Sequence, residues 1–419
     1  MRTTITFLVL LLITITANAQ NALLKAGYLI NPSDGSVLEN QIIEIEHGKI
    51  KSITNYKDAP KNSDFIDLSD TWVTPGLIDC HVHLTLNLEY GQFDIYRNYL
   101  EDSNAYRALV GAENAKQLLY GGFTTVKEIG SDGDYITADI IKAIDNNLIE
   151  GPTIIYAGKI IAPYGGQLKN INPTHEGFWN YEFIDADSNE EIRKAIRKNI
   201  YNGANCIKLV SGDQNYFYSK EEITFAVNEA NKSGLKVTVH ALNDNAAKEA
   251  VLGGVAAIEH GMFLSDETLK LMKEHDIFLV GTDLSIENWL AYGMSKMQAE
   301  YMYQKTLDRL IRAYNIGVKI AFGTDVIIDL KNKNRLESNY NLLKTWKEAK
   351  IPSLKILQTM TTDAAELLGI RNKKGSIENG YDADIVAFSN NPLNDIENIN
   401  SIKFVMKKGN VIINFTKKK

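Results

Sequence analysis

Two histidines separated by a single residue, His81 and His83, follow an apolar stretch that begins at Thr74. Alternate side chains of a β-strand point to the same face, so the two imidazoles can bind one cation together. A His-x-His pair alone fits ordinary hydrogen bonding as well as it fits a metal site. The pair therefore indicates a metal site only together with other candidate ligands in the chain.

Four more residues suited to metal binding or acid–base chemistry end segments that read as β-strands. They are Lys208, His240, His260 and Asp325. Each has an ordinary explanation, since strand-end histidines and aspartates often make structural hydrogen bonds and lysines usually reach solvent. In a closed barrel of parallel strands, however, the carboxyl ends of the strands meet at one mouth. Such a barrel would place these four residues beside His81 and His83.

The segments between Thr74 and residue 370 alternate between strand-like and helix-like patterns, which predicts a parallel sheet. Their length favours a closed (β/α)8 TIM barrel over two open sheets. Ser219, with Glu222 three residues later, predicts a capping box at the start of a helix. The predicted strands are residues 123–128, 153–161, 206–210, 235–240, 256–260, 277–282 and 318–325, and the main predicted helices are 105–119, 190–202, 219–234, 244–252, 266–274 and 353–368.

Both ends of the chain have a different pattern from the barrel region. Residues 22–30, 41–53 and 402–413 alternate apolar and polar side chains around turn signals, as antiparallel strands do. We therefore expect an α/β fold in which both ends join in one small β-sandwich domain beside the barrel. The predicted boundaries are 20–73 and 371–419 for the two parts of the β-sandwich and 74–370 for the barrel.

Residues 1–19 read as a cleavable signal peptide. Arg2 provides the basic start, residues 5–15 an apolar centre too short to span a bilayer, and Ala17-Asn18-Ala19 a cleavage site. We expect the mature chain to begin at Gln20, to lack a membrane span and to be periplasmic or secreted. No cysteine lies near the cleavage point, and the predicted directions of Cys80 and Cys206 favour two buried free thiols over a disulfide.

The composition narrows the class of partner. A net charge of -7 argues against nucleic acid and anionic membranes, because both require a basic surface. A small-molecule substrate remains the expected partner. The sequence does not determine the oligomeric state, and it is compatible with a homo-oligomer.

Several motifs together resemble the amidohydrolase superfamily over nearly the whole mature chain. Within that superfamily the chain is most similar to the imidazolonepropionase-like and Xaa-Pro dipeptidase-like members, through Glu259-His260-Gly261 and the segment 218–222. The wider resemblance rests on Pro75-Gly76-Leu77-Ile78-Asp79 with His81 and His83, on the lysine strand and the two later histidines, on Gly323-Thr324-Asp325, and on Gly375-Ser376-Ile377 with Ala383-Asp384-Ile385-Val386.

The resemblance implies a site for two divalent metal ions, usually Zn²⁺. His81, His83 and Asp325 would hold one ion, His240 and His260 the other, and Lys208 would bridge both as a carbamate formed with carbon dioxide. Burial would favour that role, because it lowers the pKa of a lysine and leaves the neutral amine that carbamylation needs. A hydroxide held between the ions would attack the substrate carbonyl, and Asp325 would carry its proton to the leaving nitrogen.

The substrate-binding residues depart from the pattern of the relatives. Tyr218 aligns with a tyrosine that contacts substrate in the dipeptidase-like members, although a packing role explains it equally well. Relatives often carry a histidine after a Gly-Gly pair, whereas Gln167 stands here. An amide donates hydrogen bonds but cannot become cationic, which weakens the case for recognition of a free carboxylate. His175, in a nearby loop, is the candidate replacement.

The leading hypothesis is an exported hydrolase that cleaves the amide bond of a dipeptide or an N-acyl amino acid. The same metal centre would also suit a lactone, a cyclic amide or a phosphotriester. A deaminase is disfavoured because such members lack the bridging lysine and carry a glutamate where Ala241-Leu242-Asn243 follows His240. A non-enzymatic binding barrel is disfavoured because every expected ligand position is filled.

Overall fold

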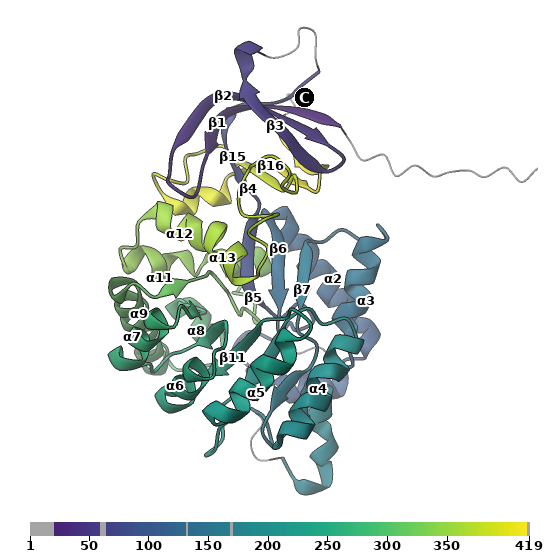
Figure 1. Ribbon diagram of the computed structural model, residues 1–419, viewed down its shortest axis with the longest axis vertical. Helices are drawn as coiled ribbons and strands as arrows, with labels where there is room; N and C mark the ends of the chain where they lie inside the picture. Colours follow the sequence, from purple (N-terminus) through teal and green to yellow (C-terminus); the bar gives the residue numbers. More distant parts are fainter. Residues whose placement is uncertain (1–20, 59–63, 131–132, 168–170, 417–419) are drawn as a thin grey trace, which may run out of the picture.

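The computed structural model describes residues 21–58, 64–130, 133–167 and 171–416. The predicted signal peptide, residues 1–19, lies outside the described residues, as do the last three lysines. A β-domain lies at one end of the molecule and a barrel surrounded by helices at the other (Figure 1). None of the helices in the described ranges is both long and apolar enough to cross a membrane.

The barrel strands follow one another in parallel, as the alternating pattern predicts. The first and last strands of the barrel, β5 and β14, meet where the Cys80 amide donates a hydrogen bond of 2.8 Å to the Phe322 carbonyl. On the opposite side, the Cys206 amide donates to the Tyr156 carbonyl at 3.2 Å. The strands are β5 (Leu77–Val82), β6 (Phe123–Glu128), β7 (Thr153–Tyr156), β8 (Ile160–Ala162), β10 (Ile207–Val210), β11 (Val237–Ala241), β12 (Ala257–His260), β13 (Phe278–Val280) and β14 (Lys319–Ile320), with β9 (Phe183–Asp185) added beside β8.

The predicted strand 153–161 is divided into β7 and β8. Gly158 lies between them with a φ of 73°, a left-handed conformation that interrupts an extended strand. A Cβ at this position would lie 2.8 Å from Asn199 Oδ1, so the turn also brings the backbone against the following helix. Strand β7 pairs with β6, and β8 pairs with β10. The two short strands β7 and β8 therefore occupy one strand position of the barrel.

Helices surround the barrel in Figure 1. The predicted capping box is confirmed, because the Ser219 amide donates to Glu222 Oε2 at 2.8 Å and the Glu222 amide donates to Ser219 Oγ at 3.3 Å. The helices are α1 (Ile95–Glu101), α2 (Asn104–Tyr120), α3 (Ile136–Asp145), α4 (Asn189–Tyr201), α5 (Lys220–Asn231), α6 (Asp244–Leu252), α7 (Asp266–Glu274), α8 (Ile286–Ala291), α9 (Lys296–Ile316), α10 (Arg335–Tyr340), α11 (Leu343–Glu348), α12 (Ser353–Thr359) and α13 (Thr362–Leu367).

The helix predicted over 353–368 is interrupted between α12 and α13. Thr361 there has non-helical dihedrals, and its hydroxyl donates to the Leu357 carbonyl at 2.6 Å. The interruption also presents the Met360 carbonyl to the amide of Ile78 on β5, at 2.7 Å. A tertiary hydrogen bond with the barrel therefore accompanies a break that local periodicity does not predict.

Strands from both chain ends form one β-domain, as predicted. A single sheet runs in the order β17-β16-β15-β4-β1-β2-β3, and β4 lies between an N-terminal and a C-terminal strand. The domain encloses its own apolar core, which includes Leu24, Ile43 and Phe404. The strands are β1 (Ala22–Ile30), β2 (Val37–Glu46), β3 (Lys49–Asn55), β4 (Ile66–Pro75), β15 (Ile385–Phe388), β16 (Ile402–Lys407) and β17 (Asn410–Asn414).

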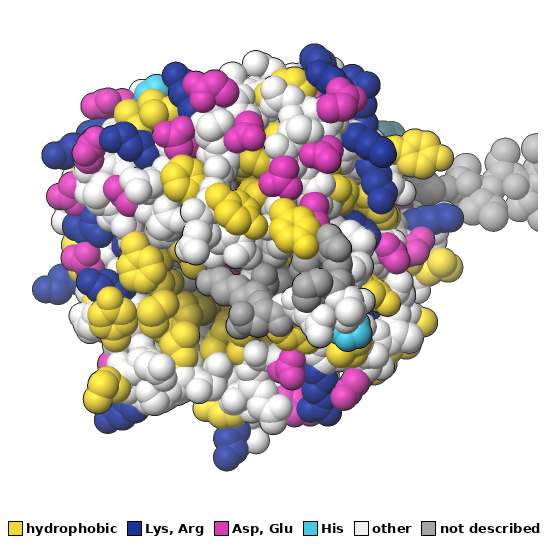
Figure 2. Space-filling model, turned by 90° about the horizontal axis from the view of Figure 1, so that it is seen from below, with side chains coloured by type: hydrophobic (Ala, Val, Ile, Leu, Met, Phe, Trp, Pro, Cys, Tyr) yellow, Lys and Arg dark blue, Asp and Glu magenta, His cyan; other side chains and the backbone are white. Residues whose placement is uncertain are grey.

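Only Gly76 separates β4 of the β-domain from β5 of the barrel. A Cβ on Gly76 would lie 2.1 Å from Thr124 Oγ1, so the chain passes too close to β6 for any larger residue. Since β5 starts at the β-domain, the carboxyl ends of the barrel strands face away from that domain. The mouth of the barrel is thus on the face shown in Figure 2.

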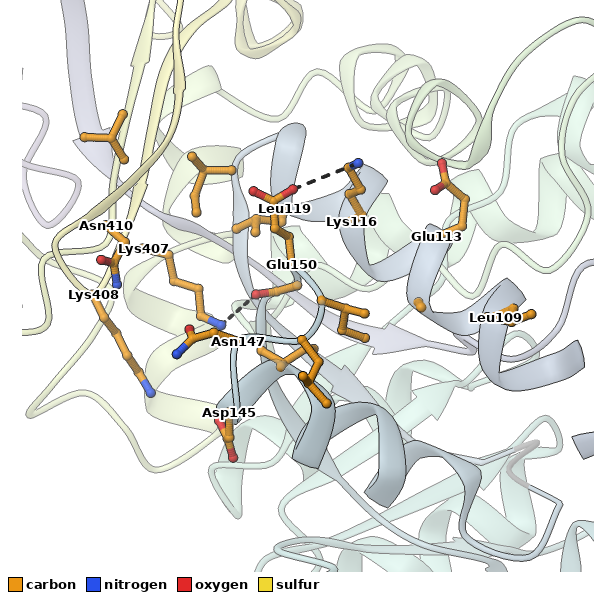
Figure 3. A pocket seen from close by; sticks show the side chains of 17 residues that line it. Leu109, Glu113, Lys116, Leu119, Asp145, Asn147, Glu150, Lys407, Lys408 and Asn410 are labelled. Atoms are coloured by element: carbon orange, nitrogen blue, oxygen red, sulfur yellow. Dashed lines mark hydrogen bonds and ion pairs between the residues drawn. The ribbon is translucent and has the colours of Figure 1, made fainter. Parts of the chain in front are cut away.

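A groove of about 720 Å³ lies where the β16–β17 hairpin meets α2 and the loop after α3 (Figure 3). Lys407 Nζ crosses this boundary and donates to the Gly151 carbonyl at 2.6 Å. On the barrel side, Lys116 Nζ lies 4.0 Å from Glu150 Oε2. The contact of Lys407 therefore joins the hairpin directly to the barrel.

Candidate metal centre

The structure brings His81, His83 and Asp325 together, as the barrel hypothesis requires. His83 Nε2 lies 3.1 Å from Asp325 Oδ1 and 3.3 Å from His81 Nε2, and His81 Nε2 lies 3.5 Å from Asp325 Oδ1. One ligand atom from each residue falls within 4.8 Å of the others. Two imidazole nitrogens and a carboxylate oxygen form a candidate site for a divalent metal ion.

The other three predicted ligands line the same cavity of about 380 Å³. The His260 ring centroid lies 4.9 Å from that of His81 and 4.4 Å from that of His240, and His260 Nδ1 lies 3.6 Å from Asp325 Oδ2. Lys208 is buried in the cavity wall, with 2% of its surface exposed. All six residues predicted from sequence therefore surround one space.

Each of the four histidines uses one ring nitrogen to contact a neighbouring polar group. For His81, His83 and His260 this contact fixes the ring and leaves Nε2 for a cation, as outer hydrogen bonds do for metal-binding histidines, whereas the Nδ1 of His240 also lies 3.3 Å from Gln167 Nε2. The donor set therefore fits a metal centre. The contacts are His81 Nδ1 with Glu259 Oε2 at 2.7 Å, His83 Nδ1 with the Gly130 carbonyl at 3.3 Å, His240 Nε2 with Asp213 Oδ1 at 3.0 Å, and His260 Nδ1 with Thr282 Oγ1 at 2.9 Å.

Glu259 is held in turn by a buried network beneath the cavity. Lys127 Nζ lies 2.7 Å from Glu259 Oε1, and the Thr238 hydroxyl donates to the same oxygen. Although burial acts in the opposite direction, Lys127 and His81 hold the pKa of Glu259 well below its usual range. No role for Lys127 or Glu259 follows from the sequence pattern alone. The available signal was a charged residue inside an otherwise apolar strand segment.

Burial also changes the protonation of Lys208 and His83. Desolvation lowers the pKa of Lys208 to about 8, so a larger fraction of its amine is neutral near physiological pH than in an exposed lysine. For His83, burial favours the neutral ring, but the carboxylates of Asp325 and Glu128 raise the pKa to about 10. A cation that binds the His83 ring must therefore displace a proton, as is usual when a metal binds.

Three residues around the cavity have left-handed backbone conformations. His260, Thr282 and Asp325 have φ values of 63°, 48° and 52°. This region is unfavourable for residues other than glycine, most of all for a β-branched threonine, and such residues often occur at functional sites. The conformations turn the chain at the ends of β12 and β13 and after β14.

The predicted substrate-binding residues have three different locations. Gln167 lines the cavity, donates from Nε2 to Asp213 Oδ2 at 2.9 Å and lies 3.3 Å from both nitrogens of His240. Tyr218 is buried outside the cavity lining, and its hydroxyl donates to the Ala186 carbonyl at 2.7 Å. His175 is exposed and lines a separate surface pocket beside Phe178. Only Gln167 is brought to the candidate metal centre.

Both cysteines are buried free thiols, as expected. Burial raises the pKa of both, so they are predominantly protonated at neutral pH. Neither Cys80 nor Cys206 lines the cavity that holds the candidate ligands.

The sequence profile of the amidohydrolase family matches residues 72–412, and the chain belongs to that family. Amidohydrolases are hydrolases of carbon–nitrogen bonds, and members of the family generally use divalent metal ions. The fold and the metal-ligand geometry described above agree with this assignment.

Two relatives and one solved structure illustrate the similarity. Ochratoxinase of Aspergillus niger is 28% identical and covers 92% of this chain and 85% of its own length. Imidazolonepropionase of Thermoplasma volcanium is 23% identical and covers 92% of this chain and 93% of its own length. The crystal structure of a Xaa-Pro dipeptidase with methionine bound in its active site is 28% identical, covers 94% of this chain and all of its own, and has a TM-score of 0.82. These matches confirm the predicted branch.

Proposed function

We propose that the chain is a binuclear metal-dependent hydrolase that cleaves the amide bond of a peptide or an N-acyl amino acid. The observation that carries this proposal is the convergence of six donor residues on one cavity, with an outer partner fixing each histidine ring. His81, His83 and Asp325 would hold one ion and His240 and His260 the other. Lys208, carbamylated by carbon dioxide, would contact both.

The chemistry divides between the bound ions and the chain. Paired divalent ions supply Lewis acidity and a nucleophile available at neutral pH. Lys208 contributes a buried amine with a lowered pKa, which suits carbamylation. Asp325, which lies within 3.6 Å of three histidines, would accept a proton from the attacking water and return it to the leaving nitrogen. The products are a carboxylic acid and an amine.

The relatives support an amide substrate over the alternatives. One matched relative is an ochratoxinase and one matched structure is a Xaa-Pro dipeptidase. A lactone, a cyclic amide or a phosphotriester would use the same donor set, so a substrate screen must include them. A non-enzymatic barrel is disfavoured because all six donor positions are filled.

Metal identity and location complete the proposal. Mixed imidazole and carboxylate donors favour Zn²⁺ among common biological cations. The basic start, short apolar centre and Ala17-Asn18-Ala19 of residues 1–19 support export to the periplasm or beyond. The partner is a small-molecule substrate, and a homo-oligomer is compatible with this function.

Substitution of Lys208 tests the proposed centre directly. Lys208→Ala should lose at least one of two bound ions per chain and lower kcat/KM by at least about 100-fold, because it removes a shared ligand. Metal analysis and a hydrolysis screen over dipeptides, N-acyl amino acids, lactones and phosphotriesters provide both readouts. Lys194→Ala, on the exposed face of α4, is the matched control and should change neither. Two retained ions and a full rate in Lys208→Ala would exclude the bridging role.

A further inference from the structure

Three aromatic side chains form one part of the cavity wall beside the proposed ligands. Phe93 and Tyr292 stack with ring centroids 5.3 Å apart and an angle of 19° between the ring planes. The ring centroid of Trp289 lies 5.9 Å from that of Tyr292. All three side chains line the cavity of about 380 Å³ that also contains the six proposed ligands. We call Phe93, Trp289 and Tyr292 the aromatic wall.

Hydrogen bonds fix the aromatic wall in relation to the candidate metal centre. The Tyr292 hydroxyl donates to the backbone carbonyl of Asp325 at 3.0 Å, so this ring is tied to the segment that carries a proposed ligand. The loop that contains Phe93 is joined to the end of α8 by a hydrogen bond of 2.7 Å from the Gly91 amide to the Ala291 carbonyl. A group that binds against the aromatic wall is therefore held next to the proposed metal ions.

The rest of the cavity wall beyond the six proposed ligands is mainly apolar. Leu86, Leu284 and Ile327 line the cavity and are buried, and Met262 and Met294 also line it. An apolar cavity of this volume suits a small substrate that carries a large apolar group. Hydrophobic side chains also gather on the face of the molecule around the mouth (Figure 2).

Phe93 differs from Trp289 in its exposure. Its side chain lines the cavity and is 56% exposed, whereas Trp289 is 8% exposed. Phe93 therefore lies where the cavity opens to solvent and has ring surface that a substrate can cover. Aromatic rings attract one another in offset or edge-to-face arrangements beyond the effect of the area that they bury. The accessible ring surface of Phe93 therefore favours an aromatic group over an aliphatic group of similar size.

We infer that the substrate carries an aromatic group next to the scissile amide bond and that this group binds against the aromatic wall. The substrate class is an amide of about the size of a dipeptide, with an aromatic amino acid or an aromatic acyl group on one side of the bond. The aromatic wall determines the specificity, and the proposed ligands carry out the reaction. This inference rests on the proposed amide hydrolysis and narrows its substrate class.

Matched dipeptides test the inference with the metal-loaded enzyme. The series contains Ala-Ala, Phe-Ala and Ala-Phe, and versions of the last two with cyclohexylalanine in place of phenylalanine. Cyclohexylalanine is at least as large and apolar as phenylalanine, so a preference for phenylalanine over it reports the aromatic ring and not the buried area. Each peptide is assayed with free ends and with both ends blocked, so that a preference for charged ends cannot produce the result.

We expect the better phenylalanine peptide to exceed Ala-Ala in kcat/KM by about 10- to 100-fold, because it buries a large apolar side chain. It should exceed its cyclohexylalanine counterpart by about 3- to 10-fold. An equal or higher kcat/KM for Ala-Ala, or for the cyclohexylalanine peptide, would overturn the inference while leaving amide hydrolysis intact.

Phe93→Leu tests the residue that we hold responsible for the preference. The substitution keeps an apolar side chain but removes the ring, so the preference for the phenylalanine peptide over the cyclohexylalanine peptide should fall by about 3- to 10-fold, mostly through KM. Phe93→Tyr keeps a ring and should keep the preference. Phe415→Leu, 65% exposed in the β-domain, is the matched control and should also keep it. An unchanged preference in Phe93→Leu would overturn the assignment to Phe93.

Binding measurements separate this inference from the proposed reaction. Phenylalaninol and cyclohexylalaninol have no amide bond, so their calorimetric titration into the metal-loaded protein needs no turnover. Tighter binding of phenylalaninol by the wild type, with the difference lost in Phe93→Leu, supports the inference even if none of the dipeptides is cleaved, in which case only the proposed reaction fails. Equal binding of the two compounds by the wild type, or tighter binding of cyclohexylalaninol, overturns it.

Discussion

At the scale of single residues, the candidate centre consists of the proposed ligands and of the residues that contact them. The sequence predicts the first group but not the second. His81, His240 and Asp325 could be predicted because strand ends meet at one mouth of a parallel barrel and because these residues match the motifs of the resembled superfamily. Glu259 and Asp213, which contact the histidine rings, could not be assigned roles in the same way. Their function depends on contacts with histidines on other strands of the barrel, and local sequence patterns do not predict such contacts.

Asp325 should be the least replaceable of these residues. Asp325→Asn keeps the shape of the side chain but removes the base, so turnover should fall by about 100- to 10,000-fold. The fold should be retained, since the contacts of the Asp325 backbone with Tyr292 and with the His81 carbonyl do not involve the side chain. Steady-state kinetics and calorimetry provide the two readouts. Turnover within a few-fold of wild type would rule out the proton-transfer role.

At the scale of elements, one aspartate connects the two segments that carry the first group of ligands. Asp79 Oδ1 accepts hydrogen bonds from the amides of His81 at 3.0 Å and Thr324 at 3.1 Å, and Oδ2 accepts from the Thr324 hydroxyl at 2.8 Å. The amide of Asp325 donates to the His81 carbonyl at 2.8 Å. The end of β5 and the segment after β14 are therefore held in a fixed relation, which sets the spacing of the ligands.

Removal of this connection should reduce stability and metal binding together. Asp79→Ala leaves three buried donors without their acceptor, at a cost of about 2–4 kcal/mol in the free energy of unfolding. Scanning calorimetry should show a Tm at least about 3 °C lower, and metal titration a weaker site. Asp70→Ala, at an exposed position of β4, should change neither quantity. A wild-type Tm in Asp79→Ala would contradict this role.

The limits of prediction at this scale have a common physical origin. The segment 244–252 and the segment 266–274 were predicted to the residue, because each has a cap and a helical period of its own. The strand predicted over 318–325 is reduced to Lys319–Ile320, because the chain turns to place Asp325. Where contacts with other elements decide the conformation, periodicity gives the type of element but not its ends.

At the scale of the whole molecule, the β-domain and the barrel are joined by contacts of the C-terminal hairpin as well as by the chain itself. Lys407, which donates to the Gly151 carbonyl, is partly buried at this boundary. Desolvation lowers its pKa from 10.5 to about 8. Between those pH values the unfolded chain holds more protons on this amine than the folded chain, so folding becomes more favourable as pH rises.

Lys407→Met should remove this dependence on pH. The stability of the wild type relative to the variant should increase by on the order of 1–3 kcal/mol between pH 7.5 and pH 10. Chemical denaturation at the two pH values measures the difference. Lys408→Met, at an exposed turn position next to it, is the matched control and should follow the wild type. A constant difference between wild type and Lys407→Met would show that Lys407 does not titrate in this range.

The position of β4 between β1 and β15 also has a consequence during synthesis. Pro75 pairs with Ile385, so one edge of β4 has no neighbour until nearly the whole protein has left the ribosome. At 5–20 residues per second this interval lasts roughly 15–60 s, during which the nascent chain exposes an edge that other chains can join. Chaperone protection of the nascent chain, or rapid translation of the barrel region, would shorten that exposure.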